Sequence, residues 1–149
     1  MSAHIAKEED VNNLFDQSLA KFGTVDALIN NVGMNILTPS VVEAEEGLWD
    51  KTIETNLKGT FLSSSLAVSL MRKTGKVKII NISSIAAKRA ARGMGIYCVA
   101  KAGVEMLTKV LAVELAKDHI NVNAVAPSVV KTRFSQPFWS NEGLLNEMT

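Results

Sequence analysis

Three polar side chains of the sequence have the types and the spacing that proton transfer requires. Tyr97 and Lys101 are four residues apart, so on a helix they share one face, and Ser84 ends an apolar, strand-like run thirteen residues before Tyr97. A free phenol has a pKa of about 10, and a nearby ammonium lowers this pKa by favouring the phenolate. The three groups therefore indicate acid–base chemistry on a carbonyl or alcohol oxygen, with the Ser84 hydroxyl free to hydrogen-bond that oxygen.

Each of these residues also has an ordinary structural explanation. A Tyr-x-x-x-Lys pair occurs in many helices as a packed phenol beside a solvated amine, and a lone serine suits a helix cap or a strand end. Further polar motifs in a fixed order favour the chemical interpretation. Along the chain these are Asn30-Asn31-Val32-Gly33 at a strand end, then Asn56, then Asn81-Ile82-Ser83-Ser84, and last Asn123-Ala124-Val125-Ala126-Pro127 followed by Thr132.

Together these motifs resemble the short-chain dehydrogenase/reductase family, from about Ile5 to Phe138. The resemblance implies a Rossmann-like, doubly wound parallel sheet and hydride transfer between NAD or NADP and a small-molecule carbonyl or alcohol substrate. It also implies that Tyr97 is the acid/base, that Lys101 holds the nicotinamide ribose while lowering the phenol pKa, and that Ser84 orients the substrate oxygen.

The same resemblance implies roles for three further residues. Asn56 would hold the water that links Lys101 to solvent, Asn30 would stabilise the sheet next to the cofactor, and Thr132 would approach the nicotinamide end. The expected cofactor-binding residues are thus Asn30, Tyr97, Lys101 and Thr132. The segment from Lys131 to Ser135, with Trp139, is most similar to the carbonyl/retinal-reductase-like branch.

The sequence departs from the family pattern in two places. Pro127-Ser128 stands where the family has Pro-Gly, and a serine adopts fewer backbone conformations than a glycine. The Gly-rich phosphate turn is absent, because neither Lys58-Gly59-Thr60 nor Arg92-Gly93-Met94-Gly95 follows a strand and opens a helix with the required spacing. We therefore expect residues 1–149 to be a single partial NAD(P)-binding domain, the catalytic half, truncated at both ends. The alternative is a non-catalytic fragment or pseudo-enzyme that keeps the site residues, cannot bind cofactor and at most associates with full-length subunits.

Strands alternate with helices along the chain, which is typical of an α/β fold with a parallel sheet. The first expected helix carries Val11, Leu14, Phe15 and Leu19 and stops at Phe22-Gly23. A second helix is expected from about 45 to 71, ending at Lys73-Thr74-Gly75, and a third from 97 to about 117. The expected strands cover residues 25–31, 76–82 and 120–126. The first and last strands should carry open edges. By the resemblance, the two long helices pair subunits in a dimer or tetramer of the full-length form, although their apolar stripes, which include Leu66, Leu70, Val104 and Leu111, also suit packing on the chain's own sheet.

Composition excludes several other classes of function. With 16 basic and 15 acidic residues, the chain has no electrostatic basis for binding nucleic acid or an anionic membrane. Cys98 is the only cysteine, which excludes an internal disulfide and suits a reducing, cytoplasmic compartment. No apolar run approaches the roughly 18 residues that span a bilayer, and we expect no metal site.

Overall fold

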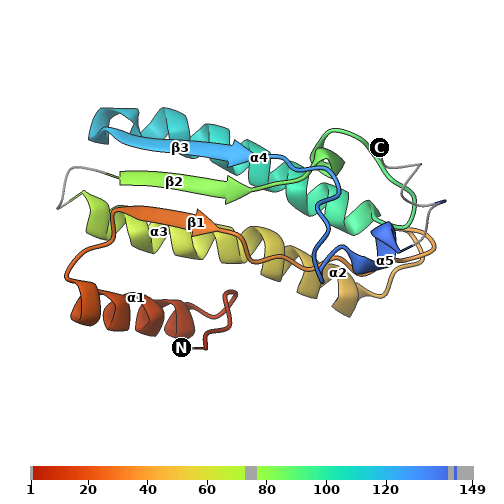
Figure 1. Cartoon of the computed structure of the whole chain (residues 1–149), viewed down its shortest axis with the longest axis horizontal. Helices are drawn as coiled ribbons and strands as arrows, with labels where there is room; N and C mark the ends of the chain where they lie inside the picture. The colour runs from red at the N-terminus through yellow and green to blue at the C-terminus, as the bar shows by residue number, and fades with distance from the viewer. Residues whose placement is uncertain (1, 73–76, 141–142, 144–149) are drawn as a thin grey trace.

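The protein is built on a three-stranded parallel sheet with the order β1-β2-β3 (Figure 1). The computed structural model describes residues 2–72, 77–140 and 143. The strands are β1 (Ala27–Asn30), β2 (Val77–Ile82) and β3 (Ile120–Val125). In the register, Ala27 pairs with Lys78, and Val77 pairs with Ile120. The parallel sheet expected from the sequence is confirmed, with β1 shorter than expected at both ends, and β1 and β3 are its edges.

Five α-helices connect or follow these strands in the described part of the chain. They are α1 (Glu8–Phe22), α2 (Glu46–Ile53), α3 (Gly59–Met71), α4 (Gly95–Leu115) and α5 (Gln136–Trp139). The predicted stop of α1 is confirmed at Gly23, which has a φ of 77° and donates its backbone N–H to Leu19 O at 2.8 Å. The helix end expected at Lys73-Thr74-Gly75 and the strand start at Lys76 lie outside the described residues.

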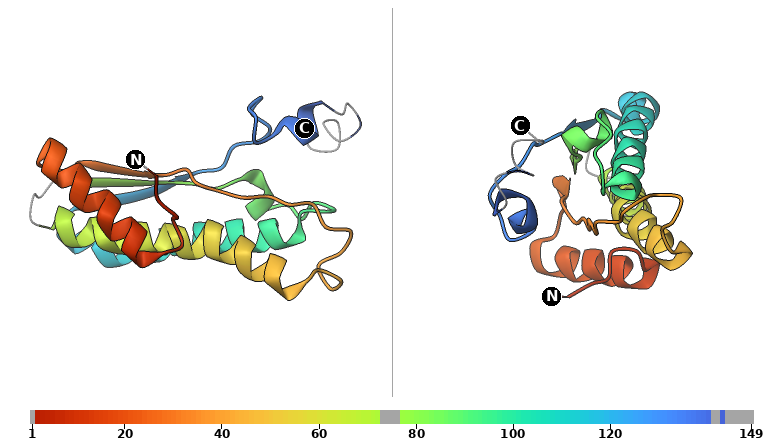
Figure 2. Two further views of the ribbon diagram at one scale, coloured as in Figure 1. Left: turned by 90° about the horizontal axis from the view of Figure 1, so that it is seen from below. Right: turned by 90° about the vertical axis from the view of Figure 1, so that its right-hand side faces the viewer.

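Helices α3 and α4 lie together on one face of the sheet, as both views in Figure 2 show. The main core forms between these helices and the strands, and α1 packs against α3 and contributes Val11 and Phe15 to that core. The opposite face of the strands carries no packed helix in the described residues, and Ile29 of β1 is 59% exposed. Leu66, Leu70 and Leu111 pack on the main core and Val104 is buried, so the apolar stripes named from the sequence serve the chain's own fold.

The helix expected from residue 45 to residue 71 is continuous but not uniform. Between α2 and α3, residues Glu54–Lys58 form a π-helical turn, in which the backbone N–H of Gly59 donates to Glu54 O. This turn holds Asn56, whose side chain is fully buried. Single π turns inside α-helices are frequent at functional sites, and the periodicity of the sequence gave no sign of this one.

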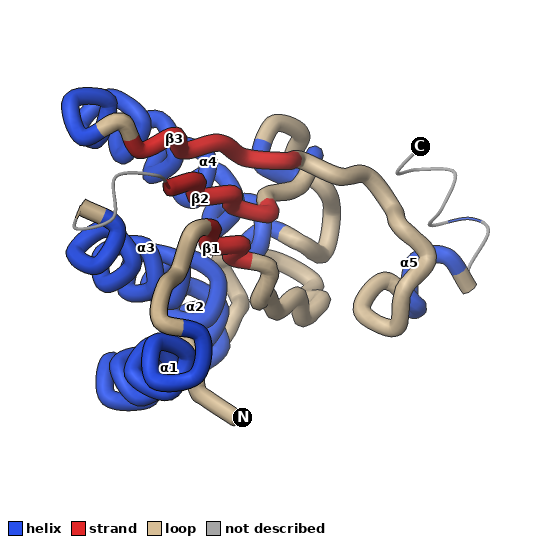
Figure 3. Tube along the Cα trace, turned by 60° about the vertical axis from the view of Figure 1, so that its left-hand side comes forward, coloured by secondary structure: helices blue, strands red, loops and turns tan. Residues whose placement is uncertain are grey.

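The carboxyl ends of β2 and β3 stay paired beyond the strands themselves. Ser83 donates its backbone N–H to Val125 O at 2.7 Å, and Ile85 donates to Pro127 O at 3.0 Å. The chain then leaves the sheet and leads to α5, which lies apart from the strands (Figure 3). Among the described residues, the one non-glycine with a positive φ is His119. Ser128 therefore needs no glycine-like backbone here.

Candidate active site

The two serines at the end of β2 have different surroundings. The Ser83 hydroxyl is buried and lies 3.4 Å from both Lys101 O and Glu105 Oε1. Ser84 has an extended backbone, and its Oγ accepts from the N–H of Ala86 at 3.2 Å at the start of a 3₁₀ turn (Ile85–Ala87). Because neighbouring residues of an extended chain point to opposite sides, Ser83 faces the interior under α4 while Ser84 faces the other way.

Tyr97 and Lys101 lie on one face of α4, as their spacing predicts. The Lys101 ammonium is 5.6 Å from the centroid of the Tyr97 ring, and Nζ donates to Ile82 O at the end of β2 at 2.7 Å. The Ser84 side chain lies near enough to the Tyr97 hydroxyl to lower its pKa. The fold thus brings the three residues together from β2 and α4.

Burial controls the titration of both α4 groups. It raises the pKa of Tyr97 above 10.0, because the phenolate loses its hydration; the nearby Ser84 side chain opposes this shift, and Cys98 adds to it. Burial also lowers the pKa of Lys101 from 10.5 to about 8. The expectation that Lys101 lowers the phenol pKa is therefore wrong for this structure, in which the ammonium lies over the ring and desolvation dominates.

Asn56 holds the loop that follows β1. Its Nδ2 donates to Met34 O and to Thr52 O, both at 2.8 Å, and its Oδ1 accepts from the Met34 N–H at 3.2 Å. A Cβ added at Gly33 would lie 3.1 Å from Asn56 Oδ1 and 3.5 Å from Lys101 Nζ. Because Gly33 has no side chain, a small space remains beside Asn56 and Lys101. These two predicted site residues therefore both lie next to Gly33.

Asn30 ties the strands to the helices beneath them. Its Nδ2 donates to Ser64 Oγ on α3 at 3.0 Å and to Asn81 Oδ1 on β2 at 2.9 Å. Asn81 in turn donates to Thr108 Oγ1 on α4 at 2.9 Å. This buried chain of side-chain hydrogen bonds links four elements directly below the site, which agrees with a sheet-stabilising role for Asn30.

The segment after β3 folds over Tyr97. The Thr132 N–H donates to Ser135 Oγ at 3.1 Å, and the Trp139 indole donates to Thr132 O at 2.9 Å, so Thr132 bonds within this segment. The Phe134 ring lies 6.5 Å from the Tyr97 ring, centroid to centroid, and Phe138 packs in a buried cluster with Tyr97. Sequence reasoning did not assign these two phenylalanines to the site, because nothing local indicates which residue a returning segment contacts.

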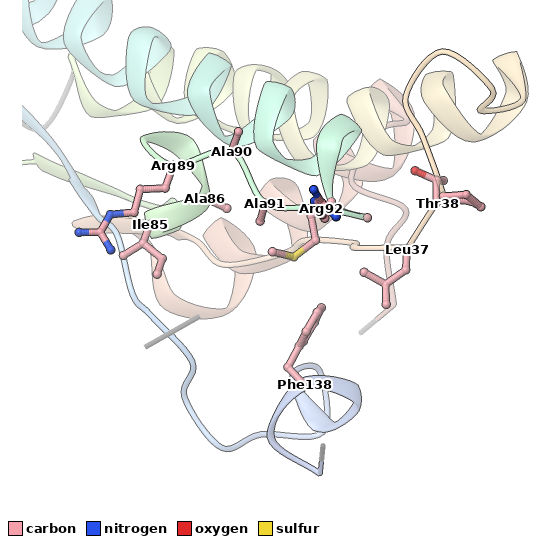
Figure 4. A pocket seen from close by; sticks show the side chains of 12 residues that line it. Leu37, Thr38, Ile85, Ala86, Arg89, Ala90, Ala91, Arg92 and Phe138 are labelled. Carbon is pink, nitrogen blue, oxygen red and sulfur yellow. The ribbon is translucent and has the colours of Figure 1, made fainter. Parts of the chain in front are cut away.

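A cavity of about 720 Å³ adjoins these residues (Figure 4). Its walls come from the loop after β1, the segment between β2 and α4, and α5. Ala86, Met94 and Phe138 line it and belong to the same buried cluster as Tyr97. The cavity therefore lies next to this cluster, and its volume is in the size range of small-molecule sites.

The residues of the described chain fit one end of a nicotinamide cofactor. The space beside Gly33 and Lys101 would be filled by a single Cβ, which suits close approach of a ligand. Gly59, in contrast, starts α3, and a Cβ there would lie 2.8 Å from Ile5 Cγ2, so this glycine serves packing and not phosphate binding. Within the described ranges, no group of three or more His, Cys, Asp or Glu side chains could hold a metal, and none of the helices there is long and apolar enough to cross a membrane.

Comparison with known proteins gives consistent matches. The family model for short chain dehydrogenases matches residues 1–143. The chain is 38% identical over 139 residues to dehydrogenase/reductase SDR family member 4 of Caenorhabditis elegans, covering 93% of this chain and 54% of that protein. It is 34% identical over 142 residues to an NAD-dependent glycerol dehydrogenase of Listeria innocua, covering 95% and 56%. The solved structure of ElxO with NADP bound superposes with a TM-score of 0.85 at 33% identity, covering 93% of this chain and 57% of that one. The chain spans about half the length of the curated relatives it matches.

Proposed function

The chain belongs to the short-chain dehydrogenase family of NAD(P)-dependent oxidoreductases, and on that premise we propose that it supplies the acid–base site for hydride transfer between NAD(P)(H) and a carbonyl or alcohol. The observation that carries the proposal is that three side chains converge: Ser84 acts on the pKa of Tyr97, and the Lys101 ammonium lies 5.6 Å from the centroid of the Tyr97 ring. The Ser83 hydroxyl next to them is buried near Lys101 O and Glu105 Oε1, which suits a structural role.

The raised pKa of Tyr97 suits one direction of the reaction. At neutral pH the phenol keeps its proton, which is the form needed to protonate the oxygen of a carbonyl as it is reduced. Ser84 would hold that oxygen beside Tyr97 through a second hydrogen bond. The bound cofactor would supply or accept the hydride.

Four residues are proposed to hold the nicotinamide half of NAD or NADP: Asn30, Tyr97, Lys101 and Thr132. The Lys101 ammonium lies next to the space at Gly33, which favours contact with a ribose there. Asn56 lies on the other side of the same space, which favours its proposed role in a water link between Lys101 and solvent. One relative is named for NAD and one structural neighbour holds NADP, so both cofactors enter the test.

The alternative is a chain that keeps the site but does not bind cofactor. It is favoured by the absence of a Gly-rich strand–turn–helix in the 149 residues, because a pyrophosphate is ordinarily bound at such a helix N-terminus. A cytoplasmic location, a small-molecule substrate and homo-oligomeric assembly remain proposals for this protein.

The decisive experiment compares the wild-type protein with Tyr97→Phe. We expect a longer version of the protein that also contains a Gly-rich phosphate turn to oxidise NADH or NADPH with a ketone panel, and Tyr97→Phe in that version to lose about 10²–10⁴-fold in turnover because its ring lacks the hydroxyl proton. Cofactor affinity, measured by nucleotide fluorescence, should be unchanged in the variant. Near-normal turnover of Tyr97→Phe would contradict the role of Tyr97, and a folded wild-type protein without measurable cofactor binding would support the alternative.

A further inference from the structure

The cavity beside Tyr97 has cationic residues in its wall and no acidic ones. Arg89 and Arg92 both line it, and no Asp or Glu does. Both arginines are exposed. The ion pairs found among the described residues are Lys58–Glu54 and Arg72–Asp118, so neither cavity guanidinium is neutralised by a carboxylate there. An anionic ligand in the cavity could therefore meet a guanidinium that no carboxylate there neutralises.

The backbone that carries these arginines is well fixed. Arg89 donates its N–H to Ile85 O at 3.1 Å, at the end of the 3₁₀ turn that Ser84 caps. On the far side of the segment, Gly93 O accepts from the Thr38 N–H at 2.9 Å, which ties the segment to the loop after β1. Both side chains thus start from a preorganised backbone, which lowers the entropy cost of binding a ligand to either of them.

The remaining walls are largely apolar. Leu37, Ala86, Met94 and Phe138 line the cavity, and the last three pack with Tyr97. Figure 4 shows Phe138 across the cavity from the segment that carries both arginines, and Arg89 at the end of the cavity near Ile85. The cavity therefore combines an apolar body with a cationic wall, and Ala86, Met94 and Phe138 connect that body to the cluster that contains Tyr97.

We propose that the substrate of this site is a ketone, or the corresponding alcohol, with an apolar body and a carboxylate that binds at the cationic wall, to Arg89 or Arg92. The position of its carbonyl at Ser84 and Tyr97 rests on the function proposed above. A guanidinium binds a carboxylate through two parallel hydrogen bonds, which fixes the orientation of the ligand as well as adding affinity. On reduction, the carbonyl carbon gains a hydride from NAD(P)H and the oxygen gains a proton from Tyr97, while the carboxylate is unchanged.

Binding of keto acids and their esters tests the charge recognition directly. The probes are benzoylformate and benzoylpropionate, which differ in the distance from carbonyl to carboxylate, each paired with its neutral methyl ester. Calorimetry compares the wild-type chain, the double variant Arg89→Gln/Arg92→Gln, and Lys88→Gln. Lys88 is the matched control, because it is an exposed cation in the same segment that does not line the cavity.

We expect wild-type protein to bind at least one acid about tenfold or more tightly than its ester, because charge-assisted hydrogen bonds are the stronger kind. The double variant should lose this preference and keep its affinity for the ester, whereas Lys88→Gln should change the preference less than about twofold because exposed charges are screened. Equal affinity for acid and ester, no detectable binding of either acid, or an equal loss in Lys88→Gln would overturn the inference.

Turnover separates this inference from the proposed function. An arginine-dependent preference for an acid, without NAD(P)H oxidation, would support the anion-binding cavity and contradict the proposed reaction. Turnover of the esters as fast as the acids would support the reaction and overturn the assignment of an anionic substrate.

Discussion

At the scale of single residues, Tyr97 and Lys101 show that a shared site can shift two pKa values in opposite directions. Both side chains are buried, and burial penalises the charged form of each. The phenol therefore loses its proton at a higher pH than usual, and the ammonium loses its proton at a lower pH. The spacing in the sequence predicted that Tyr97 and Lys101 share a face of one helix, as they do in α4. The sequence did not predict the raised phenol pKa, because the degree of burial depends on segments that are distant along the chain.

The lowered pKa of Lys101 makes stability depend on pH. Between about 8, its pKa in the folded protein, and 10.5, its ordinary value, the unfolded chain holds the lysine proton and the folded protein does not. The free energy of unfolding should therefore rise with pH in this window, by on the order of 1–3 kcal/mol between pH 8 and 10 relative to Lys101→Met. Tyr97 acts in the opposite direction above pH 10, where its deprotonation favours the unfolded chain. Urea unfolding of both proteins measures the difference, and parallel pH profiles would contradict the prediction.

Ser83 and Ser84 should separate stability from catalysis. Ser84→Ala removes the hydroxyl that acts on Tyr97 and should lower turnover about 10²- to 10³-fold, a loss of the size expected for one hydrogen bond that strengthens in the transition state. Ser83→Ala removes a buried hydroxyl near Glu105 and should lower the unfolding free energy by about 1 kcal/mol with little effect on turnover. Turnover of one ketone and thermal unfolding are measured for both variants. A larger loss of turnover in Ser83→Ala than in Ser84→Ala would assign the substrate contact to Ser83 instead.

At the scale of elements, the sequence predicted the type and order of each long helix and strand, because apolar spacing records which face is buried. It did not predict the π turn over Glu54–Lys58. These residues fit an α-helix equally well by composition, and the turn is accompanied by the non-local bonds of Asn56 to Met34. The sequence did not predict the cavity walls for a similar reason. Arg89 and Phe138 are distant along the chain, and the fold brings both to the same cavity.

Gly33 should tolerate no side chain beside the π turn. In Gly33→Ala the new Cβ would lie 3.1 Å from Asn56 Oδ1, and Asn56 is held by three hydrogen bonds, so we expect a loss of about 1–2 kcal/mol in stability. Any NAD(P)H-dependent turnover should fall with it, because Lys101 Nζ is the next atom the methyl would meet.

Gly47→Ala is the matched control for this substitution. Its Cβ would meet nothing within 4 Å, and Gly47 lies in α2, so alanine there should raise stability by up to about 1 kcal/mol. Urea midpoints of the two variants should move in opposite directions, and a Gly33→Ala protein as stable as Gly47→Ala would refute the close packing of this site.

At the scale of the whole molecule, exposed apolar side chains lie on the sheet edges, in the loop after β1 and on the outer face of two helices. Ile29 and Val125 lie on the edge strands and are exposed. Phe61 of α3 and Met106 and Val113 of α4 are exposed as well, with Val113 at 79%. Open edges and apolar faces of this kind favour association with other chains. The sequence predicted the edges from the strand order but not which helical residues would stay exposed.

The 149-residue polypeptide should therefore associate in solution and bind a nicotinamide cofactor poorly by itself. Association follows from the exposed residues on β1, β3, α3 and α4. Weak binding follows because contacts at Asn30, Tyr97, Lys101 and Thr132 surround only the nicotinamide end, and they must offset an entropy cost of roughly 4–15 kcal/mol without phosphate contacts. Titration calorimetry with NADH and NADPH, run beside light scattering, measures both properties. A monodisperse monomer that binds NADH or NADPH with micromolar affinity would contradict both expectations. The described residues would then bind the cofactor without a Gly-rich turn.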